Sequence, residues 1–164
     1  MTNRDVARIC DTIVSGHEPS MPEPKSIDSA FISLRCTNVT RFGAESWKFD
    51  FEGRTKLQVY CPWRIVSPAG IALGSADHEQ QFGLPKPVDA TGEAQRLLNA
   101  KAVKLTVRAR TADLLIEFEN GSCLEVFNSS SGYEGWECSD KDGLLVVAQG
   151  GGDLATWNVA PPLV

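Results

Sequence analysis

Apolar and polar residues alternate along much of the chain, in short segments separated by turn-forming residues. Residues 103–110 read VKLTVRAR, in which every second side chain is apolar. This period of two is typical of a β-strand with one buried face, so the apolar positions from Val103 to Ala109 are predicted to face a core. Leu114, Ile116 and Phe118 continue the alternation and predict the next strand.

A turn at Glu119-Asn120-Gly121 follows this second strand. A two-residue Asn-Gly turn would place Leu124 opposite Glu117, on the polar face. A three-residue loop with Gly121 in the left-handed region instead pairs Ile116 with Leu124, so that both apolar side chains share one face. The apolar pattern therefore predicts a β-hairpin with the three-residue loop.

The chain contains an internal repeat. Residues 47–59 read WKFDFEGRTKLQV and residues 114–126 read LLIEFENGSCLEV, so the pattern F-E-x-x-x-x-L-x-V recurs 67 positions later. Beyond an insertion near residues 128–132, Trp63 matches Trp136 at an offset of 73. Correspondence over this length predicts a duplicated structural unit. In the first unit, the equivalent hairpin is predicted to pair Trp47 with Val59.

The two units span about residues 26–82 and 90–157, and the Pro-containing stretch 83–91 connects them. Each begins with a short helical pattern, and Thr91 has the side chain of an N-cap for the second helix. Each unit then has about four antiparallel strands. The predicted fold class is therefore α+β and β-rich: two tandem helix-plus-four-strand repeats that form one sandwich or barrel-like domain over residues 25–164.

Residues 1–24 lie before the repeats and predict an additional amphipathic helix with a Pro-rich linker. Thr2 and Asp5 have the spacing of a capping box, and an apolar stripe follows at helical spacing. The stripe favours a helix docked on its own domain, and the alternatives are a dimer contact or a partner-binding helix. Its members are Val6, Ile9, Cys10, Ile13 and Val14.

Composition and charge exclude several functional classes. The chain has 164 residues with 42% hydrophobic and 23% charged side chains, which is sufficient for a hydrophobic core that needs no disulfide or structural metal. No apolar run approaches the ~20 residues that span a bilayer, and the N-terminus lacks the apolar segment of a signal peptide. The net charge of −5 argues against nucleic acid as a partner. We therefore expect a soluble cytoplasmic protein that binds neither nucleic acid nor membranes.

The cysteine pattern indicates free thiols. The five cysteines are widely spaced, their number is odd, and no C-x-x-C motif occurs. Only two histidines, His17 and His78, are available as metal ligands. We therefore expect reduced cysteines, no metal site and no cofactor.

The acidic residues are concentrated in residues 111–142, which contain eight Asp and Glu residues and a single base, Lys141. The preceding residues 101–110 contain four bases and no acid. One interpretation is cross-strand charge pairing on the solvated face of a hairpin. The other is an acidic surface that binds a basic protein partner. The residues predicted to contact such a partner are Glu117, Glu119, Glu125, Glu134 and Glu137.

Sequence motifs of catalysis are absent. The chain has no nucleophile elbow, phosphate loop, H-E-x-x-H or dinucleotide fingerprint. The best polar cluster is Asp77-His78-Glu79, in which an imidazole between two carboxylates could act as a general base. Consecutive residues rarely converge on one substrate, so a solvated loop is the simpler interpretation.

Aromatic residues recur at matching places in the two units. Trp63 and Trp136 are predicted to fill one core from two sides, together with Phe51 and Phe118. The remaining aromatic residues could line a groove for a ligand or a protein. They are Trp47, Tyr60, Tyr133 and Trp157.

Two segments, PWRIVSPAGIALGSADH at 62–78 and YEGWEC at 133–138, resemble a family of small bacterial proteins, a domain of unknown function. The resemblance covers about residues 30–153 and implies no catalytic residues. In size and charge the chain also resembles immunity proteins that neutralise bacterial toxins. The leading hypothesis is thus a non-catalytic, immunity- or regulator-like protein-binding module with an acidic and aromatic surface. The alternatives are a small hydrolase-type enzyme centred on Asp77 and His78, and a small-ligand module with a pocket between the repeats.

Overall fold

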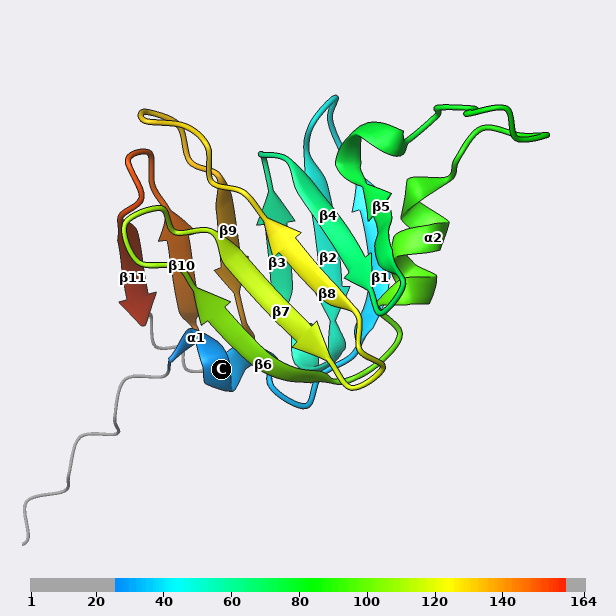
Figure 1. The fold of residues 1–164 in the computed structure, drawn as a ribbon. Helices are drawn as coiled ribbons and strands as arrows, with labels where there is room; N and C mark the ends of the chain where they lie inside the picture. Colours follow the sequence, from blue (N-terminus) through cyan, green and yellow to red (C-terminus); the bar gives the residue numbers. More distant parts are fainter. Residues whose placement is uncertain (1–25, 159–164) are drawn as a thin grey trace, which may run out of the picture.

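In the computed structural model, the described residues, 26–158, form two antiparallel β-sheets that face each other as a sandwich (Figure 1). The six-stranded sheet has the order β1-β2-β3-β9-β10-β11, and the five-stranded sheet has the order β5-β4-β8-β7-β6. The sheets do not close into a barrel, so of the two predicted architectures the sandwich is confirmed. The predicted N-terminal helix lies outside the described residues.

The elements follow each other as two series, each of which begins with an α-helix, and the first series also contains two short 3-10 helices. In the first series they are α1 (Ile27–Phe31), β1 (Cys36–Arg41), β2 (Trp47–Phe51), η1 (Glu52–Arg54), β3 (Lys56–Val59), β4 (Trp63–Ser67), β5 (Gly70–Gly74) and η2 (Ser75–Asp77). In the second they are α2 (Ala90–Leu97), β6 (Ala102–Val107), β7 (Leu114–Phe118), β8 (Cys123–Val126), β9 (Trp136–Ser139), β10 (Leu144–Ala148) and β11 (Leu154–Asn158).

The two units exchange strands. Strands β1–β3 of the first unit continue into β9 and β10 of the second, and β6–β8 of the second unit continue into β4 and β5 of the first. The helices are exchanged in the same way, because α1 contacts β6 and β10, whereas α2 contacts β1 and β5. The sequence predicted two tandem helix-plus-sheet repeats. The structure shows instead that each sheet contains strands of both units, so the units are intertwined.

The strand registers of the two units correspond residue by residue. Trp47 pairs with Val59 and Ile116 pairs with Leu124, as predicted for the two hairpins. Leu114, the equivalent of Trp47, pairs with Val126. Across the exchange, Val59 pairs with Trp136, and the equivalent Val126 pairs with Trp63. The same pairings thus recur at offsets of 67 and 73, which supports the duplication. The three-residue loop is also confirmed, since Phe118 N–H donates to the Ser122 carbonyl at 2.9 Å and Gly121 has φ of 81°.

The core lies between the sheets and is centred on three fully buried tryptophans, Trp47, Trp63 and Trp136. The Trp63 ring contacts those of Trp47 and Phe49 edge to face, at centroid distances of 4.9 and 5.3 Å. Such pairs add stabilisation to the large apolar area that the rings bury. The predicted role of Trp63 and Trp136 as two sides of one core is therefore confirmed.

Three details differ from the sequence predictions. Each unit contributes five strands in the same order, not four, and β11 is an additional strand at the end of the second unit. Val103 is 53% exposed because a bulge between Ala102 and Lys104 turns it out of the core face. The N-cap of α2 is Asp89, whose carboxylate accepts from the backbone N–H groups of Thr91 and Gly92, and Thr91 lies inside the helix.

Candidate functional site

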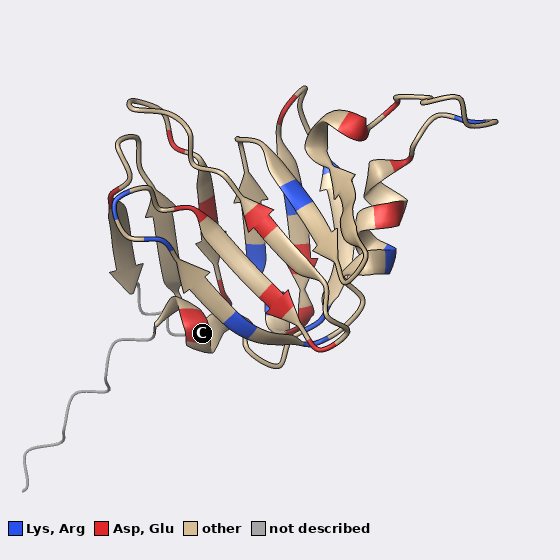
Figure 2. Cartoon of the chain, in the orientation of Figure 1, with Lys and Arg blue, Asp and Glu red and all other residues tan. Residues whose placement is uncertain are grey.

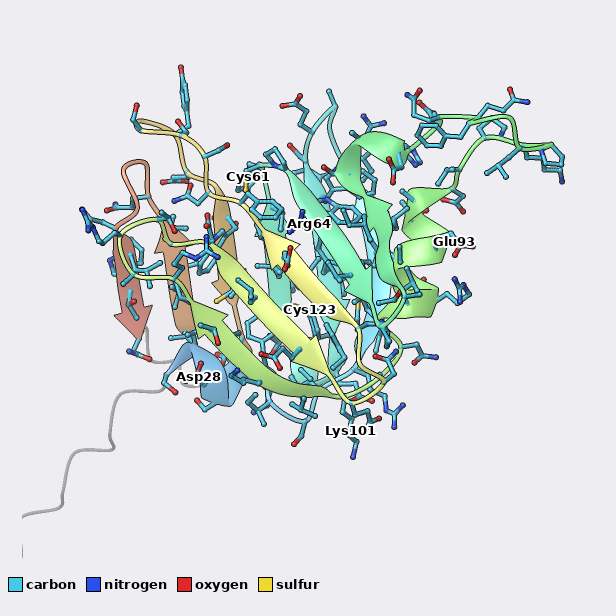
Figure 3. All side chains as sticks on the ribbon, in the orientation of Figure 1. Asp28, Cys61, Arg64, Glu93, Lys101 and Cys123 are labelled. Carbon is cyan, nitrogen blue, oxygen red and sulfur yellow. The ribbon has the colours of Figure 1, made fainter. Side chains whose placement is uncertain are left out.

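Four loops meet at one end of the sandwich, at the top of Figure 1, and enclose two adjoining cavities of about 860 and 430 Å³. Glu45, Cys61 and Pro62 line both cavities, so the two are neighbours, and together they are here named the end groove. Cys61 lies at this end in Figure 3. The loops are residues 42–46 between β1 and β2, 60–62 between β3 and β4, 75–80 after β5, and 127–135 between β8 and β9.

The larger cavity combines tyrosine rings with carboxylates. Tyr60, Tyr133, Glu45 and Glu134 line it, no Lys or Arg is among its described lining residues, and the Tyr133 side chain is 83% exposed. Burial raises the pKa of the Tyr60 hydroxyl, and a hydrogen bond with Glu137 and the charges of Glu137 and Glu134 raise it further. The cavity therefore has an electronegative and aromatic wall.

The smaller cavity is lined by residues of both charges. The Arg41 guanidinium lies 5.7 Å from the centre of the Trp47 ring, and its Nε donates to the Ala44 carbonyl at 3.1 Å. The His78 ring contacts Trp47 edge to face at 5.5 Å. Its Nδ1 accepts from the Ala90 backbone N–H at 3.3 Å, so the proton of the neutral imidazole lies on Nε2. Glu45 and Glu79 supply the carboxylates of this cavity.

The structure places the predicted cluster Asp77-His78-Glu79 at the end groove, but the three side chains do not line one common site. Asp77 accepts from the Gly74 backbone N–H at 2.7 Å and stabilises the turn after β5. His78 and Glu79 line the smaller cavity, and Asp77 is not among the residues that line it. The hydrogen bonds of Asp77 and of His78 Nδ1 therefore go to backbone groups and serve local structure.

The five predicted partner-contacting glutamates do not lie on one surface. Glu117 and Glu125 lie on the outer face of the five-stranded sheet, where bases and acids alternate (Figure 2). Lys104 faces Glu117 in the strand register and its Nζ lies 2.9 Å from the carboxylate, while Arg64 faces Glu125 and pairs with it. Glu119 lies 3.7 Å from Arg35. On this face the acidic side chains are therefore paired with bases, mostly across neighbouring strands, which is the first of the two interpretations of the acidic segment.

Glu134 and Glu137 lie elsewhere: Glu134 is at the end groove, whereas Glu137 is on the outer face of the six-stranded sheet and lines neither cavity. Glu137, on β9, accepts a hydrogen bond from Gln58 and approaches Tyr60. Glu134 lines the larger cavity. Neither Glu134 nor Glu45 forms an ion pair with a base of residues 26–158. Glu45 and Glu134 are therefore groove carboxylates without a paired base among residues 26–158.

Sequence reasoning did not select Glu45, Cys61 or Pro62. The signal that points to them is the change of offset between the repeats from 67 to 73, because it places six extra residues in the loop between β8 and β9. This loop forms one wall of the larger cavity, opposite the short loop 60–62. An insertion in one of two matching units thus indicates where the units differ in structure.

The cysteines of the described residues are free thiols, as predicted, whereas Cys10 lies outside these residues. Burial raises the pKa of the Cys61 thiol to about 12 and that of Cys123 to about 11. Carboxylates add to both shifts, Asp113 at Cys61 and Glu125 at Cys123. Both groups are therefore protonated at neutral pH and are poor nucleophiles.

We expect alkylation by iodoacetamide at pH 8 to be slower in the folded protein than in urea, roughly 100-fold at Cys123 and roughly 1000-fold at Cys61. The reason is that a thiol of pKa about 11 is only about 0.1% thiolate at pH 8, and one of pKa about 12 only about 0.01%. The rates should rise with pH up to the folded pKa values. Peptide-resolved mass spectrometry of quenched samples measures each site, with the urea-unfolded protein as control. Equal rates in both states would contradict the assignment.

Neither helix of residues 26–158 is long or apolar enough to cross a membrane. Within the same residues, no three His, Cys, Asp or Glu side chains gather closely enough to hold a metal ion.

Comparison with known proteins gives one match. No curated protein and no solved structure matches the chain. The model of a family of unknown function, DUF6188, matches residues 32–158, which include every described strand and α2. This agrees with the resemblance inferred from the segments at 62–78 and 133–138. The chain therefore belongs to the DUF6188 family of unknown function.

Proposed function

We propose that this protein is a non-catalytic binding module that holds a basic segment of another protein in the end groove. The observation that carries the proposal is the larger cavity, whose lining combines two tyrosines and two carboxylates and contains no described base. Carboxylates pair with Lys and Arg side chains, and aromatic rings attract the same cations through their π-systems. The chemistry of the cavity is thus complementary to a basic segment.

The charge distribution supports this location over the sheet face. Glu117 and Glu125 already have bases at hydrogen-bonding distance, so a partner would have to displace Lys104 and Arg64 to reach them. Glu45 and Glu134 have no such competitor among residues 26–158. Attraction of an external cation is therefore stronger at the end groove than on the five-stranded sheet, and this favours an immunity- or regulator-like role in which a basic partner is bound and blocked.

The test compares two charge reversals of the same kind. A partner is first isolated from the native host by capture on the immobilised protein, and its affinity is then measured for Glu134→Lys and for the matched control Glu117→Lys. We expect Glu134→Lys to weaken binding at least roughly tenfold, because an attraction becomes a repulsion at the groove. Glu117→Lys should change affinity less than about twofold. The reverse ranking would place the partner on the five-stranded sheet and overturn the proposal.

A small-ligand function is the second candidate, and the volume of the larger cavity favours it. About 860 Å³ lies within the usual range for small-molecule sites, and its walls come from both units, at residues 60–62 and 128–135. If the groove binds a small molecule and not a protein, we expect a small molecule of the native host to occupy it. Mass spectrometry of the protein purified under native conditions would detect such a ligand.

A further inference from the structure

Strand β11 (Leu154–Asn158) forms one edge of the six-stranded sheet, at the left of Figure 1. Among residues 26–158 its backbone pairs with β10 alone, and no hydrogen bond leads from β11 to another described element. Its side chains are largely exposed, with Leu154 at 42% and Trp157 at 47%. A free edge of this kind is a template for a further strand.

The other edge strands of the two sheets are β1, β5 and β6, and helices contact all of them. Helix α2 packs against β1 and β5, and α1 packs against β6. The segment after α1 also pairs with β6, because Ser33 N–H donates to the Ala102 carbonyl and Ala102 N–H donates to the Leu34 carbonyl, at 2.8 Å each. These contacts limit access of another chain to the three edges.

Strand β11 also lacks the features by which natural edge strands avoid pairing. Such strands carry charged residues, prolines or bulges, and β6 has both Lys104 and a bulge. Residues 154–158 read LATWN, without a charge or a proline, and Figure 2 shows no charged residue on this strand. Their register with β10 runs without a bulge. The edge is therefore regular and open to pairing.

This edge arises from a difference between the two units. Strands β5 and β10 occupy matching places, since Ile71 corresponds to Leu144 at the offset of 73. After β5 the chain continues to α2, which packs against β5 itself. After β10 the chain turns back and adds β11 to the sheet. The second unit thus has one more strand than the first, and this strand provides the free edge.

The free backbone groups of β11 occur at alternate residues. At the turn that joins β10 to β11, Gln149 N–H donates to the Asp153 carbonyl at 2.9 Å. Hydrogen-bonded pairs alternate with non-hydrogen-bonded pairs along an antiparallel ladder, so the backbone groups of Ala155 and Trp157 also point to β10. The remaining residues of the strand have their N–H and C=O groups on the free edge. They are Leu154, Thr156 and Asn158.

We propose that β11 pairs with β11 of a second copy of this chain, so that two six-stranded sheets join into one continuous sheet in a symmetric dimer. A two-fold axis at Thr156 makes the two strands antiparallel, and the same surface then serves both copies. Thr156 faces Thr156 of the partner subunit, and Leu154 faces Asn158 of the partner subunit. All three residues have free backbone groups, so each copy donates to the other and accepts from it.

The side chains of β11 fit this register. Ala155 faces Trp157 of the partner subunit in a non-hydrogen-bonded pair, in which side chains approach most closely. The smallest side chain of the strand thus lies beside the largest, and the two-fold axis repeats this contact. Threonine opposite threonine is also a favourable cross-strand pair. An uncharged strand has no charge by which to select a different protein, whereas its own copy meets no like charge here.

The dimer leaves both end grooves open. Antiparallel pairing reverses the direction of the strands, so the end grooves of the two copies lie at opposite ends of the joined sheet. Dimer formation is therefore independent of the proposed function. Two five-residue strands bury less than the roughly 1,200–2,000 Å² of stable complexes, so the dimer is a weak one, with a Kd of about 10–100 µM.

The first experiment measures sedimentation velocity of the full chain from about 5 to 500 µM, the range that covers this Kd. We expect monomer at the low end and dimer at the high end. Trp157→Lys places like charges on both sides of the two-fold axis and should weaken the dimer at least roughly tenfold. The matched control Ile71→Lys changes an exposed apolar residue of β5 and should leave it unchanged. A native chain that stays monomeric throughout, or equal effects of the two variants, would overturn the inference.

Hydrogen exchange followed by NMR tests the edge without any substitution. The amides of Leu154, Thr156 and Asn158 should exchange rapidly in dilute protein and slowly in concentrated protein. The amides of Ala155 and Trp157, which donate to β10, are internal controls and should be protected at both concentrations. Slow exchange of the first three amides in dilute protein would mean that another segment of the same chain covers the edge. That result would overturn the inference.

Cross-linking tests the register. In a hydrogen-bonded antiparallel pair the Cα atoms lie about 5.5 Å apart, a distance that a disulfide spans. Thr156→Cys should therefore form a disulfide-linked dimer under mild oxidation. Asn158→Cys faces Leu154 of the partner subunit, so it should link much more slowly, and the native chain with its own cysteines gives the background. Equal rates for the two variants, or a faster rate for Asn158→Cys, would contradict the two-fold axis at Thr156.

Discussion

Replacement of Trp136 by alanine is expected to lower the free energy of unfolding by about 3–5 kcal/mol. The Trp136 side chain is fully buried at the point where the two units exchange strands, and it pairs with Val59 on one side and with Ala148 on the other. Truncation leaves a large cavity between the sheets and removes the indole hydrogen bond to Ala112. Urea titration followed by circular dichroism measures the loss. A value below about 1 kcal/mol would contradict the burial of this ring.

Phenylalanine substitutions separate the hydrogen bond from the packing. Trp136→Phe and Trp63→Phe remove the same atoms from matching strand positions, but only the former leaves a buried acceptor, the Ala112 carbonyl, without its donor. Trp136→Phe should therefore cost about 1–3 kcal/mol more than Trp63→Phe. Equal costs would show that the Trp63 indole N–H also has an acceptor in solution.

Local strand pairing could be predicted from the sequence because it depends on side-chain alternation. Ile116 and Leu124 can share a buried face in only one register, and Gly121 tolerates the left-handed conformation that this register requires. The repeat extended the prediction to Trp47 and Val59. The exchange of strands between units leaves no such trace, because Val59 could pair equally well with an apolar residue of its own unit.

The bulge at Ala102 and the end groove could not be predicted from the sequence, for related reasons. A bulge changes which side chains face the core without changing the residue types, so Val103 follows the alternating pattern and is exposed. The end groove combines loops far apart in the sequence, and Glu45 and Cys61 belong to no motif. The role of Asn128 was equally hidden, because only the structure shows that its carboxamide bridges the Thr111 and Gln149 carbonyls.

Association with the basic partner is expected to slow about 100-fold as the salt concentration rises from low ionic strength to 1 M. The Debye length falls from ~10 Å at 0.1 M to ~3 Å at 1 M salt, so the groove carboxylates attract the partner only at short range in high salt. Stopped-flow or surface-based kinetics at several salt concentrations measure the on-rate. The off-rate should change less, because contacts inside the groove are shielded from the solution.

The slope of this dependence identifies the carboxylates that steer the partner. Glu45→Gln and Glu134→Gln each remove one charge from the groove and should flatten the dependence of the on-rate on salt, whereas the matched variant Glu117→Gln should leave it nearly unchanged because Lys104 already neutralises that carboxylate locally. Flattening by Glu117→Gln alone would show that the partner approaches the five-stranded sheet. An on-rate that does not depend on salt in any variant would mean that shape and polar contacts select the partner, and that the unpaired charges of the groove have no part in the encounter.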